Sequence, residues 1–413
     1  MIQSFFWNGI SVSIRMLTLL GLNKILAMYV GPAGYATLGQ FQNAIQMIMT
    51  VASGAFNTGV IRYTAEYADD PKQQQALWQT AGSLALLGAL VTSVIVIFFH
   101  KSLAVLLLHN TTYGSVFIML GILLIFFVFN ALLLSILNGA KQIRRYVVAN
   151  IAGSIISFIL TVPLIIGFGL YGALLSLSIN QSLCFFATIW ICYRTPGFKF
   201  SYLFGRIQPI LAHKLFKYTI MTMVSAACVP VTQIIVRQYI GSKLGWEAAG
   251  YWEAMTRLSG AYLLLVTTTL SVYYLPRLSE IKDRIQLKLE ILHGYKVILP
   301  VSILFSMAMY IFRSPIISML FTAKFQPIQA LFPWQLCGDT LKILSWLLAY
   351  VYLAKGFTRL FIISEICFSI MFVILVVVFE RMFALQGVVI AYAINYFLYF
   401  CFVFWSLKSL RIL

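Results

Sequence analysis

Eight charged side chains lie inside long apolar stretches of this 413-residue chain. They are Arg15, Lys24, Arg237, Glu253, Arg257, Asp339, Lys342 and Glu365. Inside a bilayer, a charged side chain that faces lipid costs roughly 3 kcal/mol or more. We therefore expect these side chains to face one another or a water-filled cavity, where they could bind a charged ligand or move an ion.

Spacing indicates which of these charges could pair along one helix. Glu253 and Arg257 are four residues apart, and Asp339 and Lys342 are three apart, so each couple could form an ion pair on one helix face. Glu365 could partner a base on a neighbouring segment. Asp339, Glu365 or Glu253 could instead couple transport to a counter-ion, H⁺ or Na⁺. Both interpretations stay open, and no other cofactor is expected.

The remaining bases suit an anion. Arg15 has no acid within reach along its own helix, and Arg237 lies on the corresponding element of the second half. A guanidinium group matches the geometry of phosphate with two parallel hydrogen bonds. Lys24 lies near the predicted outer interface. That position is as consistent with a side chain that snorkels towards water as with one that has a role in a cavity. The sequence therefore predicts an anion site that includes Arg15 and Arg237.

Uncharged polar residues follow the same helical faces at steps of three and four residues. One stretch carries Ser4, Asn8, Ser11, Arg15 and Thr18; others carry Asn43 between Gln40 and Gln46, Arg257 after Glu253, and Gln335 before Asp339 and Lys342. Their simplest use is to line a hydrated lumen. We assign Arg15, Lys24, Arg237, Arg257, Asn43 and Gln335 to substrate binding in that lumen.

The composition determines which elements carry these residues. The chain is 61% hydrophobic and only 10% charged. A helix needs about 20 apolar residues to cross a bilayer, and its backbone groups must be paired within the segment. We predict an all-α integral membrane protein with twelve helices. They cover roughly residues 4–30, 35–62, 77–99, 113–137, 146–168, 170–193, 214–240, 250–276, 291–312, 331–354, 358–380 and 384–407.

Basic loops stay on the cytoplasmic side. With a cytoplasmic N-terminus, most of the 29 Lys and Arg residues fall there, so both termini are expected in the cytoplasm. This topology and contact with anionic lipids account for the net charge of +18 without any nucleic acid. The halves resemble each other weakly at a nearly constant offset, which predicts two pseudo-symmetric six-helix lobes, 1–195 and 214–413, joined by a cytoplasmic loop, 196–213. Transporters with such repeats carry the substrate path at the repeat interface.

Enzyme chemistry finds little support in the chain. The six cysteines form no CxxC pair and the four histidines show no ligand spacing, so no metal site is expected. No Ser/His/Asp arrangement is present. We predict a protein that makes and breaks no bond.

Several longer segments resemble a known family. They are VGPAGYATLGQFQN at 30–43, GVIRYTAEYADDPKQ at 59–73, SVYYLPRLSE at 271–280, LFPWQLCGDTLKILSW at 331–346 and YLAKGFTRLFIISEI at 352–366. Over essentially its whole length the chain resembles the Wzx-type flippases of O-antigen and enterobacterial common antigen assembly. These belong to the multidrug/oligosaccharidyl-lipid/polysaccharide (MOP) exporter superfamily.

The resemblance implies a fold and an activity. The fold would be MATE-like, with two six-helix lobes in the bacterial inner membrane. The activity would be alternating-access movement of an undecaprenyl-diphosphate-linked oligosaccharide, an O-antigen unit or the lipid III of enterobacterial common antigen, from the cytoplasmic to the periplasmic leaflet. The polymerase and the chain-length regulator of the glycan pathway are the implied partners beside the membrane lipids.

The resemblance also bears on the site residues. Arg15, Lys24 and Arg237 fall where such flippases often carry a base, and Asp339 stands with Gln335 and Lys342 in a motif of the tenth span. Arg257 matches no basic position of the family, so its role depends on the polar stripe alone.

Two alternatives remain. A MATE-like drug or cation antiporter would share the fold, although a net-cationic lumen suits organic cations poorly. A lipid-linked glycan polymerase would be an enzyme, and such enzymes usually present a large periplasmic loop that is not predicted here. The sequence does not identify the glycan.

Overall fold

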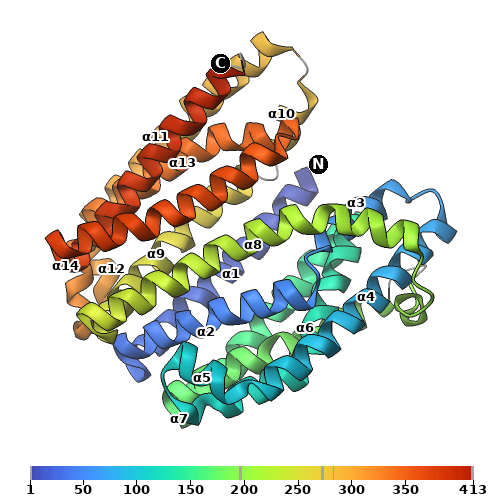
Figure 1. Ribbon diagram of the computed structural model, residues 1–413, viewed down its shortest axis with the longest axis horizontal. Coiled ribbons are helices and arrows are strands. Elements are labelled where there is room, and N and C mark those ends of the chain that lie inside the picture. Colours follow the sequence, from blue (N-terminus) through green and yellow to red (C-terminus); the bar gives the residue numbers. More distant parts are fainter. Residues whose placement is uncertain (1, 195–197, 271–273, 282, 411–413) are drawn as a thin grey trace. The chain divides into compact units, whose positions relative to one another are not determined.

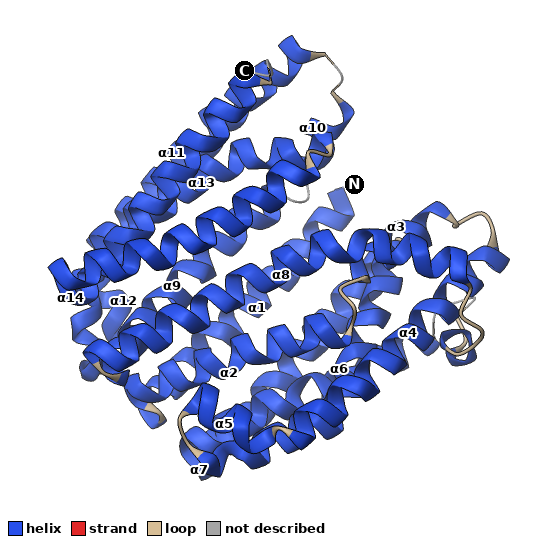
Figure 2. Ribbon diagram, viewed as in Figure 1, coloured by secondary structure: helices blue, strands red, loops and turns tan. Residues whose placement is uncertain are grey.

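The computed structural model describes residues 2–194, 198–270, 274–281 and 283–410. Side chains are described for these residues except 2–15, 217–221, 225, 265, 268–269 and 276. Every regular element in the described part is a helix (Figure 2). The predicted all-α class is confirmed.

Contacts divide the chain into two compact units. The first comprises residues 1–30 and 37–234, and the second residues 31–36 and 235–413. The division falls inside two helices, α2 (Gly31–Ala52) and α8 (Pro209–Leu244). The lobes 1–195 and 214–413 with their connecting loop stay a prediction from the sequence.

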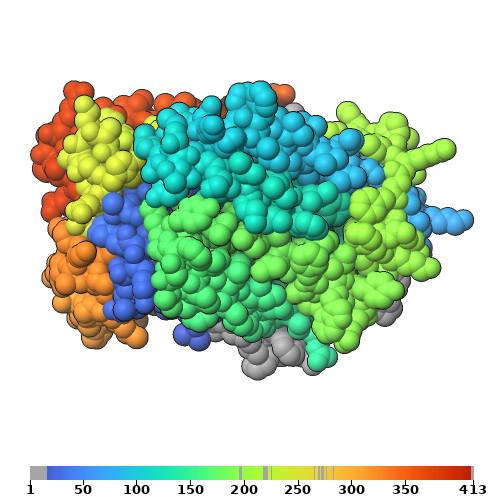
Figure 3. All heavy atoms as spheres, turned by 90° about the horizontal axis from the view of Figure 1, so that it is seen from below, coloured from blue at the N-terminus to red at the C-terminus, as the bar shows by residue number. Residues whose placement is uncertain are grey.

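The first unit is built from helices that follow one another along the chain (Figure 1). They are α1 (Ile2–Tyr29), α2 (Gly31–Ala52), α3 (Asn57–Glu66), α4 (Pro71–Phe98), α5 (His100–Leu108), the 3₁₀ turn η1 (Thr111–Tyr113), α6 (Gly114–Gly139), α7 (Ile143–Tyr193), η2 (Phe200–Leu203) and the start of α8. In Figure 3 the side chains of α4, α6 and α7, cyan to green, cover one face of this unit. Val91, Val94 and Phe98 of α4 are exposed, as expected of side chains that face lipid.

The second unit repeats this order of elements. After the end of α8 come α9 (Trp246–Thr269), α10 (Leu275–Glu280), α11 (Arg284–Ile311), α12 (Arg313–Leu320), the 3₁₀ segment η4 (Ala323–Leu331), α13 (Phe332–Lys355) and α14 (Thr358–Ser409). Helices α11, α13 and α14 run side by side (Figure 1), and Ile291, Leu347 and Val403 meet in the core between them. The pair α11–α12 follows the same order as α4–α5, and the predicted pseudo-symmetric six-helix lobes stay a prediction.

The longest helix of each unit is broken at an equivalent position. Helix α7 has 51 residues and is interrupted at Gly169 (φ 56°, ψ −130°); α14 has 52 residues and is interrupted at Ala384 (φ 48°, ψ −133°). At about 1.5 Å per residue each would measure more than twice the roughly 30 Å of a hydrocarbon core. A Cβ on Gly172 would overlap the Leu164 carbonyl, so the chain turns back on itself there. Both breaks fall where the sequence predicted one span to end and the next to begin.

Eight helices in the described part are long and apolar enough to cross a membrane, or up to nine if the bent pair α2 and α3 is one span. The chain is therefore a multi-pass membrane protein. The number of twelve spans stays a prediction.

Candidate functional site

Helix α9 presents polar side chains on two different faces. With about 3.6 residues per turn, Glu253 and Arg257 share one face, whereas Ser259 and Tyr262 share another. The first pair meets α8, and the second meets Asp339 of α13. Helix α9 therefore connects two buried polar clusters of the second unit.

The first cluster is a triad of two arginines on one carboxylate. Arg237 Nη2 of α8 pairs with Glu253 Oε2, and Arg257 Nε lies 2.7 Å from Glu253 Oε1. The Arg237 side chain is 1% exposed, whereas that of Arg257 is 21% exposed. Three charged groups with one negative charge among them carry a net charge of +1. The net positive charge of the triad is most accessible to solvent at Arg257.

Aromatic rings flank both guanidinium groups. The guanidinium carbon of Arg237 lies 5.6 Å from the centroid of the Trp252 ring, and that of Arg257 lies 5.4 Å from the centroid of the Tyr35 ring. Cation–π contacts of this kind stabilise a partly desolvated cation. Each guanidinium group of the triad therefore contacts an aromatic ring as well as the shared carboxylate.

Two predictions are decided by the triad. The Glu253–Arg257 ion pair, predicted from a spacing of four residues, is confirmed. The interpretation of Arg237 as an unpaired base is wrong, because Glu253 reaches it from the next helix. Its assignment to substrate binding stays a prediction, although its burial leaves little of it accessible.

The second cluster surrounds Asp339, which is completely buried. The Ser259 hydroxyl lies 2.8 and 2.7 Å from the two Asp339 oxygens, and the Tyr262 hydroxyl donates to Oδ2. Gln335 Nε2 and the Tyr392 hydroxyl donate to Oδ1 at 3.2 and 2.8 Å. Four neutral donors from α9, α13 and α14 therefore satisfy this carboxylate, so the three helices meet at one residue.

The predicted Asp339–Lys342 ion pair is wrong. The half-buried Lys342 has no carboxylate within salt-bridge distance in the described part of the chain. Its Nζ instead lies 4.8, 5.1 and 5.6 Å from the ring centroids of Trp346, Tyr396 and Tyr392. The oxygens of Asp339 are occupied by neutral donors, and the ammonium group points to ring faces instead.

The remaining predicted residues lie elsewhere. Glu365 is half-buried on α14. No described base lies within salt-bridge distance of it, but it interacts electrostatically with Lys342 of the neighbouring α13, so its pairing with a base stays a prediction. Lys24 and Asn43 are half-buried on α1 and α2. Arg15 belongs to α1, but it falls outside the described side chains.

Sequence reasoning missed the three hydroxyl donors to Asp339 and the rings around Lys342, whereas it had placed Gln335 beside Asp339. Ser259 and Tyr262 are three residues apart, and Tyr392 and Tyr396 are four apart, so each pair shares a helix face. That signal is weak, because 15% of this chain is aromatic.

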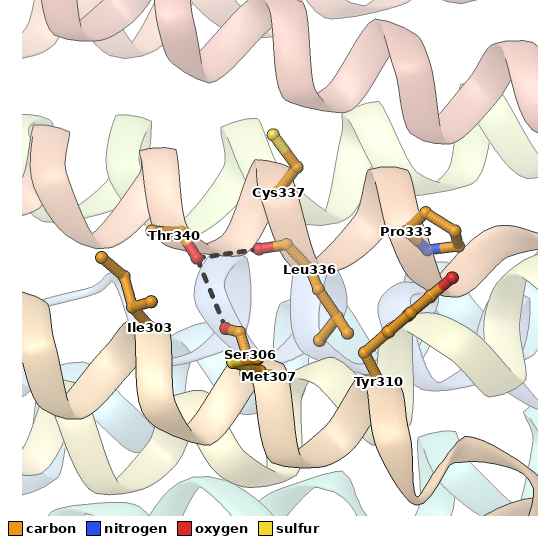
Figure 4. A pocket seen from close by; sticks show the side chains of 8 residues that line it. All are labelled: Ile303, Ser306, Met307, Tyr310, Pro333, Leu336, Cys337 and Thr340. Atoms are coloured by element: carbon orange, nitrogen blue, oxygen red, sulfur yellow. Dashed lines mark hydrogen bonds between the residues drawn. The ribbon is translucent and has the colours of Figure 1, made fainter.

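An apolar pocket of about 430 Å³ lies between α11 and α13 in the same unit (Figure 4). Its lining includes Ile303, Met307 and Leu336, and its polar contacts include the 3.3 Å bond between Ser306 and Thr340. Asp339 does not line the pocket, and none of the lining residues is charged. The described residues hold no cluster of three or more His, Cys, Asp or Glu for a metal ion.

This chain is similar to known proteins in sequence and in fold. The family model described as "Polysaccharide biosynthesis protein" matches residues 1–282. The lipid III flippases of Escherichia coli (strain K12) and Shigella flexneri are each 27% identical over 365 residues, which cover 88% of this chain and 88% of each relative.

Solved structures share the fold. A multidrug resistance MATE family transporter of the MOP superfamily, in an inward-facing conformation, matches with a TM-score of 0.78 and 15% identity, over 97% of this chain and 98% of that one. The lipid II flippase MurJ, in an inward closed conformation, matches with a TM-score of 0.74 and 17% identity, over 99% of this chain and 88% of that one. At such identities the likeness concerns the fold alone.

Proposed function

Because this chain belongs to the polysaccharide biosynthesis protein family, we propose that it is a flippase for an undecaprenyl-diphosphate-linked oligosaccharide. The substrate would move from the cytoplasmic to the periplasmic leaflet of the bacterial inner membrane. The observation that carries the proposal is the match to two lipid III flippases over 88% of both chains. Buried basic charge within apolar helices is consistent with it, because a diphosphate cannot cross hydrocarbon without neutralising groups.

Arg257 is the described base best suited to the diphosphate. Its side chain is 21% exposed, and its Nε donates to Glu253. A guanidinium group suits phosphate geometry, and the triad keeps a net positive charge beside this partly exposed side chain. Arg15, Lys24, Asn43 and Gln335 are proposed to complete the binding of diphosphate and sugars.

Transport would follow alternating access, in which the repeats move around a central substrate site. A counter-ion, H⁺ or Na⁺, is proposed to drive it. Asp339 and Glu253 are candidates for coupling, because each joins two or more helices through one carboxylate. Glu365 is the third candidate.

A drug or cation antiporter is not favoured, because the curated relatives matched over 88% of this chain are lipid III flippases. The relatives are transporters, which supports a function without catalysis. Both termini are proposed to be cytoplasmic, and the polymerase and the chain-length regulator of the glycan pathway are proposed as partners.

The decisive experiment uses purified protein in liposomes that contain a fluorescent undecaprenyl-diphosphate-linked oligosaccharide. A membrane-impermeant reagent that quenches the fluorophore reports how much lipid changes leaflet. Wild type should equilibrate the leaflets, and Arg257→Gln should be slower by roughly tenfold or more, as expected for one lost charge-assisted contact. Val91→Ala on the lipid-facing side of α4 is the matched control. A wild-type rate equal to that of protein-free liposomes would refute the proposal.

A further inference from the structure

Two arginines from opposite ends of α7 meet on the first unit. Arg145 lies in the first turn and Arg194 is the C-cap, and Arg145 Nη2 donates to the Arg194 carbonyl oxygen at 3.1 Å. Arg145 Nη1 also donates to Gln142 Oε1 at 3.3 Å. Both acceptors are neutral, so they do not compensate the charge of Arg145. Among the described residues, no carboxylate lies within salt-bridge distance of either arginine.

The Arg194 guanidinium group lies over an exposed tryptophan ring. Its carbon atom Cζ is 3.9 Å from the centroid of the Trp190 ring. Arg194 is exposed, and Trp190 is 58% exposed. The cation–π attraction draws the guanidinium group to the ring face, but a ring supplies no oxygen acceptor. Arg194 therefore presents N–H donors to acceptors from outside the protein.

These side chains lie at the level of lipid headgroups. Between its break at Gly169 and Trp190, helix α7 rises about 32 Å, at about 1.5 Å per residue. The hydrocarbon core of a bilayer is about 30 Å thick. With the break at one surface of that core, Trp190 reaches the other surface, and Arg194 lies just beyond it. Tryptophan is enriched at this interface, where its ring is in contact with both apolar chains and water.

An apolar strip continues from Trp190 into the membrane. Leu183, Phe186 and Trp190 follow one another at steps of three and four residues, so they share one face of α7. Leu183 is 37% exposed and Phe186 is 55% exposed. The helix rises about 10 Å from Leu183 to Trp190. A positive group above an exposed apolar strip matches a lipid whose phosphate lies above its acyl chains.

We propose that Arg145, Arg194 and Trp190 form a binding site for an anionic glycerophospholipid of the bilayer. The headgroup phosphate accepts hydrogen bonds from the guanidinium groups, and one acyl chain lies along Phe186 and Leu183. The bound lipid neutralises two bases at one end of α7 and so stabilises the junction between the two ends of this helix. The site goes beyond the proposed transport, because its ligand is a resident lipid of the membrane and not the transported one.

Native mass spectrometry of lipid binding tests the inference. Purified, delipidated full-length protein in detergent is titrated with dioleoyl phosphatidylglycerol, which is anionic, and with dioleoyl phosphatidylcholine, which has the same chains and no net charge. The ratio of the two affinities separates the contribution of the headgroup charge from that of the acyl chains. The variants are Arg194→Gln, Arg194→Lys, Arg145→Gln and Phe186→Ala. Lys72→Gln, which removes one exposed positive charge outside the site, is the matched control.

Wild-type protein should prefer phosphatidylglycerol. Arg194→Gln should weaken binding of that lipid by about fivefold, the effect of one basic group at a membrane surface, and Arg145→Gln should act in the same direction. Arg194→Lys should retain most of the preference, because it keeps the charge. Phe186→Ala should weaken both lipids by the same factor, since it removes only apolar contact. Lys72→Gln should leave the affinity ratio unchanged.

Three results overturn the inference. One is a wild-type affinity ratio in Arg194→Gln, a variant that replaces an exposed side chain and should fold normally. Another is an equal fall of the ratio in Lys72→Gln, which would assign the preference to the net charge of the protein. The third is a short-chain prenyl diphosphate that displaces phosphatidylglycerol at equal concentration, which would assign the site to the transported class of lipid.

Discussion

Replacing Glu253 by glutamine should destabilise the second unit strongly. The carboxylate is the acidic partner of Arg237, whose side chain is 1% exposed, and of Arg257. The variant leaves two guanidinium groups close together, one of them cut off from water. Removing one partner of a buried ion pair typically costs about 3–5 kcal/mol, because the remaining charge stays desolvated.

That cost corresponds to a fall in apparent melting temperature on the order of 10 °C for a unit of this size. The assay heats purified protein in detergent and measures the fraction that remains monodisperse by size-exclusion chromatography. A matched control is Glu280→Gln, which removes an exposed carboxylate 3.8 Å from Arg277 and should change stability by less than about 1 kcal/mol.

A second variant separates charge burial from side-chain packing. Arg237→Met added to Glu253→Gln removes the buried charge that lost its partner, so the double variant should recover much of the lost stability. If Glu253→Gln melts at the wild-type temperature, or if the double variant is less stable than Glu253→Gln alone, the buried-triad reasoning is wrong.

Three further outcomes are expected. Gly169→Ala should lower the free energy of unfolding by roughly 1–3 kcal/mol, because alanine is strained at φ 56° and ψ −130°, whereas Ala384→Gly should raise it by about 1 kcal/mol by relieving the same strain. Thermal unfolding that changes equally in both variants would contradict this. Gly338→Ala should force the Tyr392 ring to move, cost about 1–3 kcal/mol and slow transport in the liposome assay; an unchanged rate would contradict it. Tags at the N-terminus, in residues 200–206 and at the C-terminus should be protected from external reagents, and a cysteine at 381–384 should be labelled from the periplasm; labelling of 200–206 from outside would refute the orientation.

Local features of this protein follow from the sequence alone. The hydrophobic composition and the length of the apolar runs determine the class, since runs of about 20 apolar residues cross lipid as helices whose backbone groups are paired within each segment. The Glu253–Arg257 pair follows from helical periodicity, because residues four apart are neighbours on any α-helix. The ends of the spans at Gly169 and near Ala384 could also be predicted, because polar or small residues interrupt the apolar runs there.

Partners on different helices depend on packing. Arg237 and Glu253 are 16 residues apart, and only the contact between α8 and α9 brings them together. Spacing allowed Asp339 to pair with Lys342, yet Ser259, Tyr262 and Tyr392 reach the carboxylate from two other helices. An intrahelical pair forms only if no better donor arrives from a neighbour. Which donors arrive is determined by how α9, α13 and α14 pack, and the helical period does not encode that packing.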